Sequence, residues 1–90
     1  KVSKKEALFL QQLQHPKISN VRSAGLIIAI EFAGFEQNKR IIDECLRQGV
    51  IVDWFLFAPH CMRLAPPLTI SEEEIEKSCT VILQSIEKAG

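Results

Sequence analysis

Hydrophobic and polar positions alternate with helical and strand periods along the chain, and the first of these patterns predicts a short helix. A capping box begins this helix at Ser3. The helix runs to about Gln14, because Pro16 disfavours the helical region for the residue before it, which makes His15 a helix-ending residue. A short strand is predicted over residues 18–21.

The strongest strand signal is the run LIIAIEF at residues 26–32, which is rich in β-branched residues. Period-2 alternation divides these residues between the two faces of a strand, with Leu26, Ile28, Ile30 and Phe32 on one face and Ile27, Ala29 and Glu31 on the other. Both faces are mostly apolar, so we expect both of them to be covered.

A second helix is predicted over residues 38–48, with an apolar stripe that consists of Ile41, Ile42, Cys45 and Leu46. Gly49 follows at the position where a left-handed cap is needed. Two strands should come next, the first beginning at 50–52 and the second at 61–64, and they should be joined around 58–60.

The last helix begins at a second capping box, from Ser71 to Glu74, whose acidic first turn suits a helix N-terminus. Its apolar stripe has helical spacing and consists of Ile75, Cys79, Ile82 and Ile86. The order of the elements predicts an α+β fold, in which the helices pack on one face of a small, three- to four-stranded, mainly antiparallel sheet.

One cluster does not fit a self-contained domain. Trp54, Phe55, Leu56 and Phe57 follow one another, and period-2 alternation cannot place all four on the same side of a sheet. We therefore expect an exposed apolar patch here, which is typical of an interface.

Composition limits what the chain can do. Its 90 residues carry 11 basic and 11 acidic side chains, so the formal net charge is zero, and the basic excess of a nucleic-acid-binding protein is missing. A chain of 10.2 kDa is one small domain, too small for a complete large-cofactor enzyme. No apolar run is long enough for a membrane span. The first residue is Lys1 rather than methionine, which suggests a piece of a longer protein.

The three cysteines do not form a metal-binding pattern. There is no CxxC pair, and the neighbours His60 and Cys61 alone lack zinc-ligand spacing. Cys45 and Cys79 lie on apolar helix stripes, where they are predicted to be structural thiols, and reduced thiols suit a cytoplasmic protein. No base is expected to activate Cys61.

A few polar residues have alternative interpretations. Arg63 lies in an apolar strand before two prolines, where it is either an ordinary surface arginine or a ligand for a carboxylate. Glu31 is interpreted as half of an internal salt bridge to Arg22 or Arg63, and His60 as an exposed loop histidine.

The other charged residues are not assigned to chemistry. The acidic turn 72–74 is interpreted as a solvated helix start rather than a metal cluster. No lysine has the apolar setting that lowers an amine pKa for Schiff-base chemistry, and this holds for Lys1, Lys4, Lys5, Lys17, Lys39, Lys77 and Lys88.

Three segments together resemble one known family. The segment 63–70, RLAPPLTI, followed by the acidic helix start at 71–75, resembles the C-terminal small domain of class III aminotransferases, the pyridoxal-phosphate enzymes that include acetylornithine, ornithine and 4-aminobutyrate aminotransferases. The segment 21–26, VRSAGL, resembles the family's V-R-G-x-G-L, with Ser23 in place of glycine. The segment 48–52, QGVIV, resembles its turn into the next strand.

This resemblance implies that residues 1–90 are a single C-terminal small domain of a fold-type I enzyme, in which Arg63 binds a substrate carboxylate. It also implies a large domain that holds pyridoxal 5'-phosphate, a homodimer, and amino-acid and 2-oxo-acid substrates. The family's Schiff-base lysine and phosphate-binding groups lie in that large domain. No catalytic, cofactor-binding or metal-binding residue is therefore assigned within this chain, and the chain alone is expected neither to bind the cofactor tightly nor to transaminate.

Two other functions remain open on the residues alone. One is a stand-alone α+β module that binds amino acids and regulates without catalysis. The other is a purely structural interaction domain.

Overall fold

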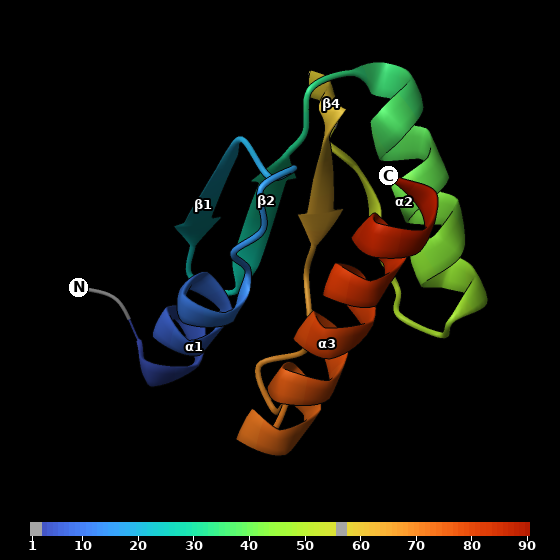
Figure 1. Cartoon of the computed structure of the whole chain (residues 1–90). Helices are drawn as coiled ribbons and strands as arrows, with labels where there is room; N and C mark the ends of the chain where they lie inside the picture. The colour runs from blue at the N-terminus through green and yellow to red at the C-terminus, as the bar shows by residue number, and fades with distance from the viewer. Residues whose placement is uncertain (1–2, 56–57) are drawn as a thin grey trace.

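The computed structural model describes residues 3–55 and 58–90, with the side chain of Phe55 outside the described part. These residues form three helices and four strands (Figure 1), in the order α1 (Lys4–Gln12), β1 (Asn20–Ala24), β2 (Ile27–Glu31), α2 (Phe35–Arg47), β3 (Asp53–Phe55), β4 (Ala58–Leu64) and α3 (Glu72–Ala89). No helix within the described ranges has both the length and the apolar character needed to cross a bilayer.

The four strands form one antiparallel sheet in the order β1-β2-β4-β3. All three helices lie on the same face of this sheet; Figure 1 shows α1 and α3 nearer the viewer than the strands, with α2 beside β4. The predicted α+β fold, with helices on one face of a small antiparallel sheet, is therefore confirmed.

The core fills the space between the helices and the sheet. The predicted stripe on the last helix is fully buried, with 0% exposure at each of Ile75, Cys79, Ile82 and Ile86. Ile28, Ile30 and Phe32 of the predicted strand face pack against the same cluster. On α2 the predicted stripe is buried except for Leu46, which is 45% exposed.

The predicted capping box is complete on the last helix, where Ser71 and Glu74 form both halves. On the first helix only half of it forms: the Ser3 side chain accepts from the Glu6 amide, while the Glu6 carboxylate accepts from the Ser23 hydroxyl. Gly49 has a φ of +93°, the left-handed value that glycine adopts without steric cost.

The predicted strand at 18–21 is wrong in its bounds, because a tight turn decides where pairing occurs. Gly25 has a φ of +64° and turns the chain, so Ala24 pairs with Ile27 and the hairpin extends back only to Asn20. The Ile18 amide instead donates to the His15 carbonyl in a local turn.

The two later strands are also displaced from their predicted positions. Residues 50–52 are not a strand, because the Val50 amide donates to the Cys45 carbonyl and so belongs to the helix end; β3 begins at Asp53. Residues 58–60 are not a connection but the first part of β4, which is held to β2 where the Phe32 amide donates to the His60 carbonyl at 2.9 Å. Leu56 and Phe57 lie outside the described residues.

The second helix begins at Phe35, three residues before its predicted start. This places Asn38 inside the helix with 0% exposure, where its side-chain amide donates to the Pro59 carbonyl at 2.9 Å. The bond ties α2 to the start of β4.

One face of the sheet has no helix over it in the described part of the chain. We predicted that both faces of the run 26–32 would be covered; within this chain Ile27 is 49% exposed, so nothing in the described residues covers it. Ala29 on the same face is nearly buried at 8%, because strands on both sides shield its single methyl group.

Glu44 on α2 is a buried carboxylate that three polar neighbours hold in its charged form. Arg47 and Gln48 donate hydrogen bonds to it, the second at 2.8 Å, and the Lys88 ammonium lies 3.5 Å away. The hydrogen bond from Arg47 is the largest cause, followed by that from Gln48, and together they lower the pKa of Glu44 to about 2.

This shift predicts an acid-dependent stability. A carboxyl whose pKa is lower in the folded chain than in the unfolded chain stabilises the fold above its unfolded pKa, and the contribution is lost as the pH falls from about 4.5 toward 2. We expect the thermal midpoint of Glu44→Gln to depend less on pH than that of the unmodified chain between these values. Equal slopes for the two proteins would contradict the assigned pairing; Asp43→Asn, an exposed acid one residue away, is the matched control.

Candidate functional site

Arg63 lies on β4, in the row of the sheet where the register aligns four residues, Arg22, Ala29, Arg63 and Asp53. Paired residues of antiparallel strands point to the same face, so the whole row belongs to the face without helices. The small Ala29 separates the two arginines. This row gives the open face two cationic side chains and one carboxylate.

The guanidinium of Arg63 is paired but accessible. Its Nη2 donates to the Asp53 carboxylate at 3.0 Å, with 45% of the arginine side chain and 61% of the aspartate side chain exposed. Asp53 is fixed in turn, because its other oxygen accepts from the Trp54 amide at 2.7 Å. A guanidinium has five N–H donors in a planar fork, so donors remain for a second carboxylate.

Sequence reasoning missed Asp53. The residue interrupts the apolar run from Val50 to Trp54, and a lone acid in such a run was a usable signal. Its partner was not predictable from spacing alone, because the pairing depends on the register between β3 and β4.

The aromatic cluster is described only in part. The Trp54 side chain is half-buried and stacks on Phe35, with ring centroids 5.1 Å apart and an interplanar angle of 20°. Phe35 is itself 51% exposed, so an aromatic surface does lie at this edge of the sheet, although Phe35 was not part of the predicted patch.

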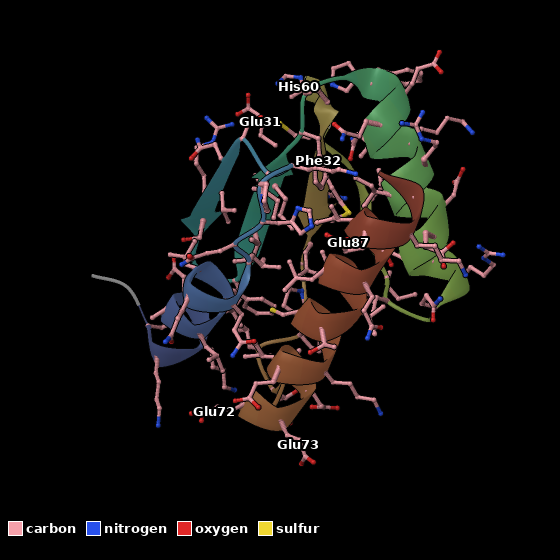
Figure 2. The ribbon with its side chains drawn as sticks, in the orientation of Figure 1. Glu31, Phe32, His60, Glu72, Glu73 and Glu87 are labelled. Carbon is pink, nitrogen blue, oxygen red and sulfur yellow. The ribbon has the colours of Figure 1, made fainter. Side chains whose placement is uncertain are left out.

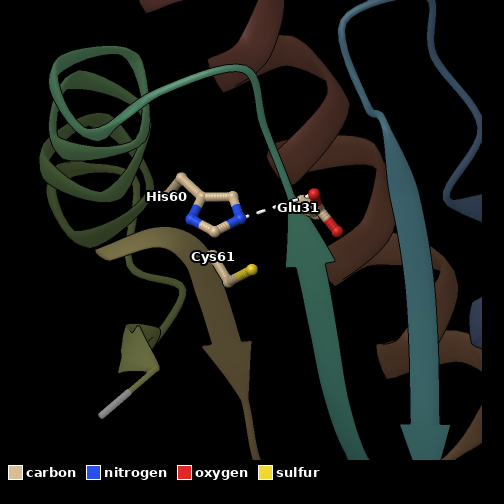
Figure 3. A group of neighbouring side chains, drawn as sticks. All are labelled: Glu31, His60 and Cys61. Carbon is tan, nitrogen blue, oxygen red and sulfur yellow. Dashed lines mark ion pairs between the residues drawn. The ribbon is translucent and has the colours of Figure 1, made fainter. Parts of the chain in front are cut away.

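The predicted partner of Glu31 is wrong. Its carboxylate lies 3.4 Å from Nε2 of His60, and not against Arg22 or Arg63, because the pairing of β2 with β4 places the start of β4 beside the end of β2 (Figure 3). His60 is accordingly a half-exposed strand residue rather than an exposed loop histidine. The same pairing puts Cys61 next to both residues, so a base does stand beside this thiol.

The remaining sequence candidates lie elsewhere. Figure 2 shows Glu72 and Glu73 at the opposite end of the molecule from Glu31 and His60, and the acidic turn is exposed as predicted. His15 contacts Glu87 of α3 and thus does more than end a helix.

The three cysteines are free and buried, as predicted for two of them. Burial raises the pKa of the Cys79 thiol to about 12 and raises that of Cys45 as well. Both are therefore inert core thiols.

No described lysine is placed to hold a carbonyl cofactor. Their side chains are exposed, except that of Lys5, which is half-buried and donates to the Leu68 carbonyl at 2.9 Å. Pyridoxal phosphate needs a lysine in a desolvated site and a set of phosphate ligands. The described residues alone do not fit it.

Comparison with known proteins identifies the family of the chain. The profile of the class III aminotransferases matches residues 1–86. The chain belongs to the class III aminotransferase family. It is 37% identical over 75 residues to an acetylornithine aminotransferase of Haemophilus ducreyi and 33% identical over 73 residues to one of Bacillus cereus, alignments that cover 83% and 80% of this chain.

The structural comparison agrees with the family match. The fold superposes on an amine transaminase from an uncultivated Pseudomonas species, solved in its PLP-bound internal aldimine form, with a TM-score of 0.81 and 28% identity over 97% of this chain. The alignments span 18% of each of the two acetylornithine aminotransferases and 22% of the Pseudomonas structure. This class III aminotransferase chain thus corresponds to about a fifth of those proteins.

Proposed function

We propose that residues 1–90 form the C-terminal small domain of a pyridoxal-phosphate-dependent aminotransferase. The complete enzyme would transfer an amino group from an amino acid such as acetylornithine, ornithine or 4-aminobutyrate to a 2-oxo acid. The observation that carries the proposal is the accessible guanidinium of Arg63 on the open face of the sheet, in a chain of this family.

Arg63 would bind the substrate carboxylate. A charge-assisted pair between a guanidinium and a carboxylate is bidentate when the fork is free to face it. Asp53 supports this role, because its hydrogen bond to the Trp54 amide keeps it in place while it steers the arginine. Fixing one end of the substrate would orient its amino group for transfer.

The rest of the enzyme would supply the cofactor. Pyridoxal phosphate acts as an electron sink for the substrate when bound. We propose that the residues that hold it belong to a large domain that packs on the open face of the sheet, where Ile27 is exposed and two arginines lie in one row. A homodimer in the cytoplasm completes the proposal, and the buried free thiols suit that reducing compartment.

Absorbance spectroscopy tests whether the cofactor-binding residues lie outside this chain. The complete enzyme is expected to show the absorbance band of lysine-bound pyridoxal phosphate and to form a 2-oxo acid from an amino donor. The 90-residue chain with added cofactor should show neither. A stable band from the chain alone would contradict the proposal.

A titration of the same chain with amino acids tests the alternative that the chain is a stand-alone regulatory module that binds amino acids. Family membership does not favour that alternative. Saturable binding at micromolar concentrations, without any aminotransferase activity in the complete protein, would establish the module and reject the proposed function.

A further inference from the structure

Three side chains with metal-binding atoms meet at one end of the sheet. Glu31 is the last residue of β2, and Cys61 is its register partner on β4, so both belong to the face without helices. His60 precedes Cys61 and turns its Nε2 to within 3.4 Å of the Glu31 carboxylate (Figure 3). One carboxylate oxygen, one ring nitrogen and the Cys61 sulfur lie within 4.8 Å of one another.

The donor set is selective. Imidazole nitrogen, thiolate sulfur and carboxylate oxygen are the three ligand types of Zn²⁺, with bond lengths of about 2.0–2.3 Å. Hard cations such as Mg²⁺ and Ca²⁺ prefer oxygen ligands alone, so the sulfur argues against them. One thiolate and one carboxylate would neutralise a divalent cation.

We propose that Glu31, His60 and Cys61 form a binding site for a zinc-like divalent cation. Three protein ligands leave the fourth tetrahedral position to a water molecule. A shallow, open hollow lies beside the site in the 90-residue chain, and Glu31 and His60 line it, so solvent reaches that position when no other domain covers this face. The proposal does not rest on the proposed aminotransferase function.

The surroundings allow the cation to bind. Cys61 is only 1% exposed, and burial, together with the charge of Glu31, raises the pKa of its thiol. Binding must therefore release the thiol proton, with the sulfur passing from S–H to a metal-bound thiolate while His60 binds as the neutral ring. Arg22 is the other charged neighbour of Cys61, and its exposed side chain can turn to solvent.

The chain contains its own control. His15 and Glu87 form a second histidine–glutamate pair, with Nε2 and the carboxylate 2.5 Å apart, but no cysteine joins them among the clusters found in the described residues. The two pairs therefore differ in the sulfur ligand. A cation that needs sulfur should distinguish them.

Titration of the chain with Co²⁺, followed by Zn²⁺, tests the site. We expect one equivalent of Co²⁺ to give a thiolate-to-metal charge-transfer band, which Zn²⁺ then abolishes by displacement, because Zn²⁺ binds such ligand sets more tightly than Co²⁺. Cys61→Ser should lose the band, and His60→Gln and Glu31→Gln should each weaken binding by roughly tenfold or more. His15→Gln should bind like the unmodified chain.

The outcomes separate the site from a simple ion pair. Circular dichroism of each variant establishes that it folds, and the half-exposed positions of Glu31 and His60 make Glu31→Gln and His60→Gln informative even if Cys61→Ser is unstable. The absence of the charge-transfer band in the unmodified chain would overturn the proposal. So would a band that survives in both His60→Gln and Glu31→Gln at unchanged affinity.

Discussion

Replacement of Ile82 by alanine is expected to lower the free energy of unfolding of this chain by about 2–5 kcal/mol, the cost of deleting a large aliphatic side chain from a packed core. Ile82 lies on the sheet-facing stripe of α3 with 0% exposure, within the cluster that joins helices and sheet. A domain of this size has a total stability of only about 5–15 kcal/mol. The loss should therefore lower the thermal midpoint by roughly 8–40 °C, at 4–8 °C per kcal/mol.

Ile51→Ala is the matched control, because it makes the same chemical change at a residue that is 80% exposed. A surface substitution of this kind should change the free energy of unfolding by less than about 0.5 kcal/mol. Chemical denaturation of both variants measures the difference. Similar losses for the two would show that α3 does not pack on the sheet as described.

The helices of this chain were predictable because their signals are local. The capping box at Ser71 and Glu74 and the spacing from Ile75 to Ile86 involve residues within a few turns of one another. The strands were predictable only where a long apolar run left no alternative, as in β2. The bounds of β3 and β4 depended on partners far away in the chain, such as the bond between the Phe32 amide and the His60 carbonyl.

In the candidate sites, too, single residues were predictable from the sequence, but their partners were not. Arg63 was recognisable because a cation in an apolar strand before two prolines is unusual, and the family resemblance supplied its proposed role. Its pairing with Asp53, and that of Glu31 with His60, required the register of two strand pairs. Glu31 and His60 are 29 positions apart in the sequence, farther than the ligand spacing of a short sequence motif.

Replacement of Arg63 by alanine in the complete enzyme is expected to cost about 2–5 kcal/mol of transition-state stabilisation for amino-acid donors, the usual cost of truncating one partner of a desolvated charge pair. At about 1.4 kcal/mol per tenfold step, kcat/KM for these donors should fall at least tenfold. The fold should survive, because the exposed pair with Asp53 contributes no more than about 1 kcal/mol. Steady-state kinetics with a carboxylate-bearing donor measures the loss.

Three comparisons show whether the lost interaction is the one with the carboxylate. A simple primary amine without a carboxylate should react equally well with the unmodified enzyme and with Arg63→Ala. Arg63→Lys keeps the charge but not the planar fork, so it should recover only part of the loss. Arg40 lies on α2 and donates to the Ala89 carbonyl on the helix side of the sheet. Arg40→Ala should therefore leave kcat/KM unchanged for both donors. If Arg63→Ala slowed both donors alike, the arginine would act as scaffold, and the proposed carboxylate site would have to lie elsewhere in the enzyme.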